Sequence, residues 1–275
     1  MYALVNEPLQ IFMDYEGGYK GTRFDRLGRI ISFGRDGIDF MGAEYGGAGL
    51  ARNAPAKGIQ GIGLCNEFGL KDPIGYDDPD SDVFLKIGVG WLKKDGKPYR
   101  ESHQYEADRL VGERDGRAFV FDSGVENGYG VRLVKEYSLL GPVCDGLEVK
   151  FSLMNIGEKR IKTSEYCHNF MSVAGFWIDS RYRIKTGNPE IDKKVKELIA
   201  GALPMYYAAY DDPEEVSGWE LTHEISPFSF KEKCHFPVSR FAVWGTRAVI
   251  SAECFYAIDL APGESASWGR EYFIG

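Results

Sequence analysis

Runs of strand length dominate this chain and limit the folds that it can adopt. Alternating or continuous apolar stretches recur along it, and Gly, Asp, Asn or Pro ends each of them. Among these stretches are GRIISFG, GVRLVKEYSLL, GLEVKFSLMN, RIKTSEYCHNFMSV and RAVISAECFYAIDL. The 34 glycines tend to stand at the ends of the runs, where tight turns need them. The pattern predicts many β-strands joined by turns.

Only one segment shows helical periodicity, PEIDKKVKELIAGAL at residues 189–203. Its apolar side chains Ile191, Val195, Leu198 and Ile199 fall on one face, with Lys and Glu opposite. The segment is interpreted as a short surface helix, or alternatively as a pair of polar strands.

Many strands with almost no helix indicate a sandwich or a barrel. No internal repeat of fixed period is present, which argues against a propeller. No linker-like tract interrupts the 275 residues, so we expect one domain over residues 1–275. The expected fold is all-β, a large twisted antiparallel β-sandwich with two sheets packed face to face.

Charge and cysteine content limit the classes of partner and the cellular compartment that we expect. The chain carries 33 Lys and Arg against 41 Asp and Glu, a net charge of −8, so it lacks the basic footprint of a nucleic-acid or anionic-lipid binder. The five cysteines are odd in number and form no C-x-x-C pair, which favours neither a zinc ribbon nor a disulfide framework. No secretory signal and no apolar run of roughly 20 residues appears. We expect a cytoplasmic protein, monomer or homodimer, with reduced thiols and a small neutral partner such as a sugar.

The chain lacks the sequence motifs of several well-known enzyme classes. No P-loop, no G-x-G-x-x-G behind a strand, no H-E-x-x-H and no G-x-S-x-G is present. The four histidines are well separated, so a histidine-rich metal site is not expected. We therefore predict no metal and no cofactor.

The stretch SEYCHNFMSV, residues 164–173, places a histidine inside an aromatic-rich strand. Strand alternation puts Glu165, Cys167 and Asn169 on one face and Tyr166, His168 and Phe170 on the other. An imidazole beside aromatic rings resembles a sugar-binding wall. The alternative is a core histidine whose hydrogen bonds are satisfied.

Glu253 stands in an otherwise apolar strand near the C-terminus, between Ala252 and Cys254. Buried there, it would have its pKa raised from about 4.3 towards the range that suits a general base. The alternative is an edge-strand glutamate that faces solvent. Together, His168 and Glu253 supply the acid and the base that proton-shuttling chemistry requires.

Two further segments carry candidate polar residues. In GTRFDRLGRIISF, residues 21–33, alternation puts Arg23 and Asp25 on one face, where they either bind a polyol or pair with each other. The stretch GLCNEFGLKDPIGYDDPDSD, residues 63–82, reads as a long solvated loop whose carboxylates do not follow the EF-hand spacing. Glu67, flanked by apolar residues, is its candidate binding residue.

Three motifs together resemble the aldose 1-epimerase (galactose mutarotase) superfamily. SEYCHNFMSV resembles its histidine-bearing strand, and GTRFDRLGRIISF resembles its early strand. VISAECFYAIDLAPGESASW is similar to the C-terminal segment of the hexose-6-phosphate mutarotase branch. The resemblance implies a galactose mutarotase-like supersandwich and a metal-free mechanism. Glu253 would take the anomeric hydroxyl proton, while His168 donates to the ring oxygen.

The superfamily carries a second histidine upstream, and here the matching region, LKIGVGWLKK, has none. Either Lys86 or Lys93 replaces it as a positive donor, or no residue does. The predicted substrate-binding residues are Arg23, Glu67, Lys93, Asn169, Trp177 and Trp219, with Trp91 as a further candidate. The leading hypothesis is a mutarotase-like enzyme; the alternatives are a non-catalytic carbohydrate-binding protein, or a lyase or hydrolase on the same scaffold.

Overall fold

Antiparallel strands build two large sheets and one small sheet in this protein. The structure is a computed structural model that describes residues 2–6, 9–14, 18–45, 58–110, 113–115, 118–141, 146–201 and 204–275. One sheet has nine strands, in the order β1-β2-β3-β5-β13-β19-β18-β15 with β4 paired to β3. Its strands are β1 (Tyr2–Asn6), β2 (Leu9–Met13), β3 (Ile30–Arg35), β4 (Ile38–Asp39), β5 (Gly63–Phe68), β13 (Ile161–Phe170), β15 (Met205–Asp211), β18 (Arg240–Thr246) and β19 (Ile250–Leu260).

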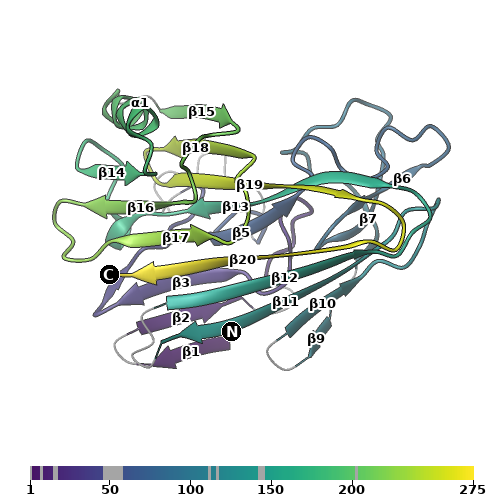
Figure 1. Cartoon of the computed structure of the whole chain (residues 1–275), viewed down its shortest axis with the longest axis horizontal. Helices are drawn as coiled ribbons and strands as arrows, with labels where there is room; N and C mark the ends of the chain where they lie inside the picture. Colours follow the sequence, from purple (N-terminus) through teal and green to yellow (C-terminus); the bar gives the residue numbers. More distant parts are fainter. Residues whose placement is uncertain are drawn as a thin grey trace.

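The second large sheet has eight strands, in the order β14-β16-β17-β20-β12-β11-β10-β9. Its strands are β9 (Glu113–Asp115), β10 (Ala118–Asp122), β11 (Val131–Leu140), β12 (Gly146–Asn155), β14 (Tyr182–Lys185), β16 (Gly218–His223), β17 (Phe230–Cys234) and β20 (Ser265–Ile274). The small sheet is β6 (Val83–Lys86), β7 (Gly90–Lys93) and β8 (Ala107–Leu110). In Figure 1 the strands of the large sheets run along the long axis, with β6 and β7 near one end.

The two large sheets pack face to face over an aromatic core. Phe33 on β3 meets Phe230 on β17 edge to face, with ring centroids 5.1 Å apart. Phe68 on β5 contacts Trp268 on β20 at 6.3 Å. Because each pair joins the nine-stranded sheet to the eight-stranded one, the core lies between the sheets. The predicted large antiparallel β-sandwich is confirmed.

The predicted helix is also confirmed, as α1 (Pro189–Ala200). Asn188 caps its N-terminus by accepting from the backbone N–H groups of Glu190 and Ile191. Ile191, Val195 and Ile199 form its buried face. A short 3₁₀ turn, η1 (Val173–Gly175), follows β13. No helix in the described part of the chain is long and apolar enough to cross a membrane.

One expected loop is instead a central strand. Residues 63–68, read as the start of a solvated loop, form the wholly buried β5 between β3 and β13. Gly63 has φ +66°, and a Cβ there would lie 2.0 Å from the carbonyl oxygen of Ile30, so this close approach of β3 requires glycine. The strand was missed because its polar side chains, Asn66 and Glu67, are satisfied by partners far away in the sequence.

Candidate active site

The register of two neighbouring strands brings the predicted acid and base together. β13 and β19 run antiparallel with Tyr166 opposite Phe255. Two residues further along β13 and two back along β19, His168 lies opposite Glu253. Side chains directly opposite one another point to the same face of a sheet. The site therefore arises on the face of the nine-stranded sheet that is turned away from the sandwich core.

His168 and Glu253 are in direct contact, with 3.5 Å between Nε2 and Oε1. Both are buried, with 4% and 3% of their surface exposed. Phe170 stacks on the imidazole at 4.1 Å, and Trp244 and Phe24 meet it edge on at 4.9 and 5.8 Å. The acid–base pair, His168 with Glu253, thus lies in an aromatic and largely apolar environment.

Burial raises the pKa of Glu253 to about 8. The hydroxyl of Ser251 donates to its Oε1 at 2.8 Å and offsets part of this effect. The backbone N–H of Asn169 donates to the Ser251 oxygen at 2.8 Å, which fixes that hydroxyl. Glu253 is therefore a neutral carboxylic acid at pH 7.

Burial lowers the pKa of His168 well below 6.5, and the nearby positive charge of Arg23 lowers it further. The imidazole is therefore neutral at pH 7, which differs from the expectation that it would ionise near neutrality. With Glu253 protonated and His168 neutral, the carboxyl carries a proton that the pair can donate, and the imidazole keeps one nitrogen that can accept a proton. Opposed pKa shifts of this kind are typical of catalytic acid and base groups.

A second carboxylate, Glu67 on β5, borders the pair but is fully engaged. Its Oε2 accepts from Arg23 Nε at 3.0 Å and from the Tyr166 hydroxyl at 2.5 Å. Its Oε1 accepts from Lys86 Nζ at 2.9 Å, and Lys86 also donates to the Tyr99 hydroxyl. Although burial opposes ionisation, Arg23 and Lys86 hold the pKa of Glu67 below its ordinary value. Glu67 therefore pairs with two positively charged side chains, those of Arg23 and Lys86.

The structure places Arg23 beside the acid–base pair, but not through the predicted strand alternation. Arg23 lies in a bend at residues 22–24, before β3, and Asp25 directly follows that bend. Arg23 pairs with Glu67, whereas Asp25 pairs with Lys135 Nζ at 2.8 Å in the core. The alternative of an Arg23–Asp25 pair is therefore wrong, because the two side chains leave the bend in different directions.

Two other predicted binding residues do not reach the pair. Lys93 is exposed on β7 and contacts Glu106 at 2.5 Å, so Lys86 is the lysine near the site. Asn169 follows His168 and points to the opposite face of β13, where its Nδ2 donates to the carbonyl of Ala252. Strand alternation explains this placement.

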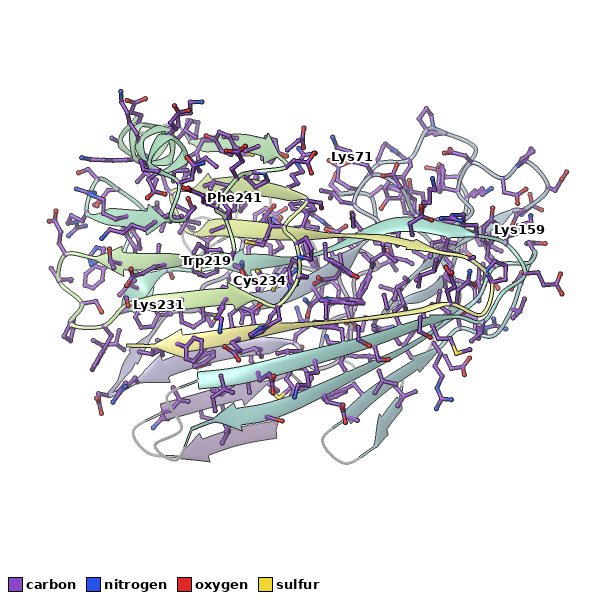
Figure 2. The ribbon with its side chains drawn as sticks, viewed as in Figure 1. Lys71, Lys159, Trp219, Lys231, Cys234 and Phe241 are labelled. Carbon is purple, nitrogen blue, oxygen red and sulfur yellow. The ribbon has the colours of Figure 1, made fainter. Side chains whose placement is uncertain are left out.

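The tryptophans are distributed differently from the prediction. Trp91 and Trp219 are buried, at 1% and 3% exposure, and lie outside the site; Figure 2 shows Trp219 among the strands near Cys234. Trp177 is half exposed and lies in a pocket at the end of the sheet. Trp244, which was not predicted, is the tryptophan in contact with His168.

Ser251 was also missed, although the sequence contains a signal for it. It precedes Glu253 by two residues in VISAECF, so the two side chains share a face of β19. A hydroxyl at that spacing is a natural hydrogen-bond partner for a buried carboxyl.

One buried cluster elsewhere resembles a metal site in composition. Ligand atoms of Glu232, Cys234 and Cys254 lie within 4.8 Å of one another in the core. However, Glu232 already accepts from Arg270 and from the Trp219 indole. The guanidinium beside these groups repels a divalent cation, so the cluster does not fit a metal ion.

Solved structures with the same fold cover the whole chain. A galactose mutarotase-like protein from Clostridium acetobutylicum matches at a TM-score of 0.59 and 12% identity, covering 99% of this chain and 94% of that one. A galactose mutarotase-like protein from Lactobacillus casei matches at 0.59 and 11%, covering 100% of both chains. The GalM/aldose epimerase homologue from C. elegans matches at 0.58 and 8%, covering 99% and 98%. No protein-family model and no curated protein matches the chain. At these identities the likeness shows the fold, and the resemblance predicted from the sequence is confirmed at that level.

Proposed function

We propose that this chain, which has the galactose mutarotase-like fold, is an aldose 1-epimerase-like enzyme that interconverts the anomers of a sugar. The observation that carries the proposal is the 3.5 Å contact between a neutral imidazole and a protonated carboxyl on one face of the sheet. A group that can donate a proton, in contact with a group that can accept one, is what ring opening and closure require.

The proposed reaction moves two protons. One member of the acid–base pair takes the proton of the anomeric hydroxyl while the other donates a proton to the ring oxygen, and the bond from C1 to the ring oxygen breaks. Rotation about C1–C2 and re-closure through the reverse transfers give the other anomer. Both sugar oxygens are bonded to the same carbon, C1, so groups 3.5 Å apart can serve both.

The location of the proton that the pair can donate decides which group is the acid. Glu253 as base with His168 as acid, the predicted assignment, and Glu253 as acid with His168 as base differ only in which group carries that proton. The pKa directions favour the second arrangement in the free protein. Since ring closure reverses ring opening, each group acts in both roles during one turnover.

Little of the acid–base pair is exposed, 4% of His168 and 3% of Glu253. Arg23, with 16% of its side chain exposed, and the half-buried Trp244 lie at its edge. We propose that a sugar reaches His168 and Glu253 past these side chains. The guanidinium offers hydrogen bonds to hydroxyl groups, and the indole offers an apolar face.

Replacing Glu253 with glutamine is expected to lower the rate of anomer exchange by about 10²-fold, because glutamine can neither give nor take the proton. Polarimetry or NMR exchange spectroscopy on a panel of aldoses, free and derivatised, measures this. Glu224→Gln, which alters an exposed carboxylate, is the matched control and should retain the wild-type rate. Equal rates for wild type and Glu253→Gln on every sugar would contradict the proposal.

The rate of anomer exchange is also expected to fall as the pH rises through about 8. Glu253 keeps its proton below that pH and loses it above, so above pH 8 the acid–base pair no longer holds a proton to donate. The pH dependence of kcat/KM, corrected for the buffer-catalysed rate, checks this. A rate that rises through pH 8 would instead assign Glu253 as an obligate base that acts only when ionised.

A non-catalytic carbohydrate-binding role is the second candidate, and the near-complete burial of the acid–base pair favours it. Sugar binding without any difference in anomer exchange between wild type and Glu253→Gln would establish that role. A hydrolase would need a second available carboxylate. Glu67 cannot supply it, because Arg23, Lys86 and Tyr166 occupy both of its oxygens.

We also make proposals for the partner, the location and the oligomeric state. A small sugar is the proposed partner, and a cytoplasmic location and a monomeric or homodimeric state stay predictions. Four cysteines, Cys65, Cys167, Cys234 and Cys254, are free and buried, which is compatible with a reducing compartment.

A further inference from the structure

Two alanines lie in a row beside the acid–base pair on the same face of the nine-stranded sheet. Ala242 on β18 is opposite Glu253, and Ala209 on β15 is opposite Ala242; Figure 1 shows β19, β18 and β15 side by side. Residues directly opposite one another point to the same face, so this alanine row continues the line of Glu253 towards the sheet edge. Ala242 shares a packed cluster with Tyr166 and Phe255, whose rings stack at 4.4 Å, which places the row on the site face.

Other neighbours of the pair on this face are larger or already bonded. Tyr166 and Phe170 flank His168 along β13, and Phe170 stacks on the imidazole. Ser251 precedes Glu253 along β19 and donates to its carboxyl. An alanine side chain ends at Cβ, so the alanine row leaves more space above the sheet than these positions do.

A hydrogen bond between two long side chains crosses the alanine row. Arg240 Nη2 donates to the Tyr207 hydroxyl at 2.6 Å. Arg240 stands two residues before Ala242 on β18, and Tyr207 stands two residues before Ala209 on the antiparallel β15. The two side chains therefore start on opposite sides of the row, and the bond between them passes over it. Ala242 has no exposed surface, as expected beneath such a bridge.

The Arg240–Tyr207 bridge is held weakly by the rest of the protein. Tyr207 is 52% exposed. Arg240 Nε makes no hydrogen bond within the described part of the chain and lies 3.7 Å from Asp211, whose side chain is 81% exposed. Exposed ion pairs contribute little to stability, so both side chains can exchange their mutual bond for bonds to a ligand.

The polar groups at the bridge match hydroxyl groups better than an anion. Arg240 only donates, the Tyr207 hydroxyl donates and accepts, and Asp211 only accepts. Hydroxyl groups need both donors and acceptors, whereas an anionic group needs donors alone and is repelled by Asp211. Trp244, opposite Tyr207, adds an indole for the apolar face of a ring.

The bridge is also within electrostatic reach of the acid–base pair. The positive charge of Arg240 lowers the pKa of Glu253, against the larger effect of burial. Neighbouring strands lie about 4.8 Å apart, so a pyranose ring with C1 at Glu253 covers β18, and its far substituents reach β15. In a hexose those far substituents are the hydroxyl groups carried by C4 and C6.

We propose that Arg240 and Tyr207 are specificity-determining residues, which bind the C4 and C6 hydroxyl groups of a neutral aldohexose whose ring lies over Ala242 and Ala209. Binding of the sugar breaks the Arg240–Tyr207 bond and replaces it with bonds to the sugar. The placement of C1 at Glu253 rests on the proposed mutarotase function, whereas hexose binding on the alanine row does not.

The test uses glucose, galactose, their common 4-deoxy analogue, their 6-deoxy analogues and glucose 6-phosphate. Isothermal titration calorimetry measures binding, and NMR exchange measures anomerisation. In the wild type, each deoxygenation should raise Kd by about tenfold, the effect of one hydrogen bond to a charged or buried partner. Arg240→Met and Tyr207→Phe should each lose the discrimination at one of the two positions, which assigns that hydroxyl to that residue. Glucose 6-phosphate should bind more weakly than glucose.

A steric variant tests the position of the ring. Ala209→Leu fills the alanine row at a partly exposed position and should remove measurable hexose binding. Ala257→Leu is the matched control, since Ala257 is exposed on the same face of β19, four residues beyond Glu253, and should bind hexoses as the wild type does. Equal melting temperatures for the two variants show that the difference is not one of folding.

The inference and the proposed function fail in different ways. If the wild type exchanges anomers but Arg240→Met and Ala209→Leu bind every hexose unchanged, or if glucose 6-phosphate binds more tightly than glucose, the inference is overturned and the mutarotase function stands. If both variants weaken hexose binding but the wild type exchanges anomers no faster than Glu253→Gln, the alanine row stands as a hexose site and the mutarotase function is overturned. Absence of both binding and exchange for glucose and galactose overturns the inference as well.

Discussion

Replacing Glu253 with glutamine is expected to stabilise the fold more at high pH than at low pH. The unfolding free energy of the variant minus that of wild type should be about 4 kcal/mol larger at pH 9 than at pH 5. In the folded protein this carboxyl keeps its proton up to about pH 8, whereas its ordinary pKa is 4.5. Because the folded pKa lies above the unfolded one, the stabilisation is complete below pH 4.5 and is lost as the pH rises through 8. Glutamine does not titrate, so the variant escapes this loss.

Urea unfolding of both proteins at pH 5 and pH 9 measures the effect. Taking the difference between the two proteins at each pH cancels the other titrating groups that they share. Glu224→Gln, an exposed carboxylate, should give a difference that does not change with pH. A difference for Glu253→Gln that is equally constant would show that this carboxyl is ionised in the fold at neutral pH.

This result would carry functional meaning beyond stability. A residue whose replacement slows anomer exchange and stabilises the fold at high pH is kept at a cost to the stability of the fold. Stability lost at a site and recovered elsewhere is the usual signature of a functional group. The same variant therefore tests both the environment of Glu253 and its role.

The local sequence pattern predicted the β-sandwich and the residues that share a strand face with His168. Alternation along residues 164–173 placed Tyr166, His168 and Phe170 on one face, and their ring contacts show that arrangement. Alternation cannot predict which residue of a distant strand lies opposite His168. That depends on the register between β13 and β19, which the packing of the whole sheet sets.

The strand that carries Glu67 was missed because buried charges violate local expectations. The run GLCNEF contains two polar residues and looked like a loop, yet it is a central strand. Lys86 from the small sheet and Arg23 from a bend neutralise Glu67 there. Only after the chain has folded do these groups meet, so no local window of sequence reveals that the polar positions are satisfied.

Replacing Arg270 with methionine is expected to destabilise the fold by about 3 to 5 kcal/mol. Arg270 on β20 has no exposed surface and contacts Glu165 on β13 and Glu232 on β17. Its Nη2 also donates to the carbonyl of Cys254 at 2.9 Å. Removing the guanidinium leaves two carboxylates buried between the sheets without their cation, which costs far more than the lost contacts.

Chemical denaturation at pH 7 measures this loss. Arg160→Met is the control, since that side chain is 57% exposed and solvent screens its pair with Asp259. Replacing Glu165 and Glu232 with glutamine in the Arg270→Met background should recover part of the loss, because neutral amides tolerate the apolar surroundings better than carboxylates do. A loss equal to that of Arg160→Met would mean that the buried carboxylates already carry protons and need no cation.

Arg270 contacts both of the strands that carry the acid–base pair. It holds Glu165, three residues before His168, and the backbone of Cys254, next to Glu253. The core-side contacts thus fix the two strands whose opposite faces carry the acid and the base. Arg270→Lys keeps the charge but loses the fork that spans both carboxylates. We expect it to retain more stability than Arg270→Met while still lowering anomer exchange, since a loosened register moves His168 relative to Glu253.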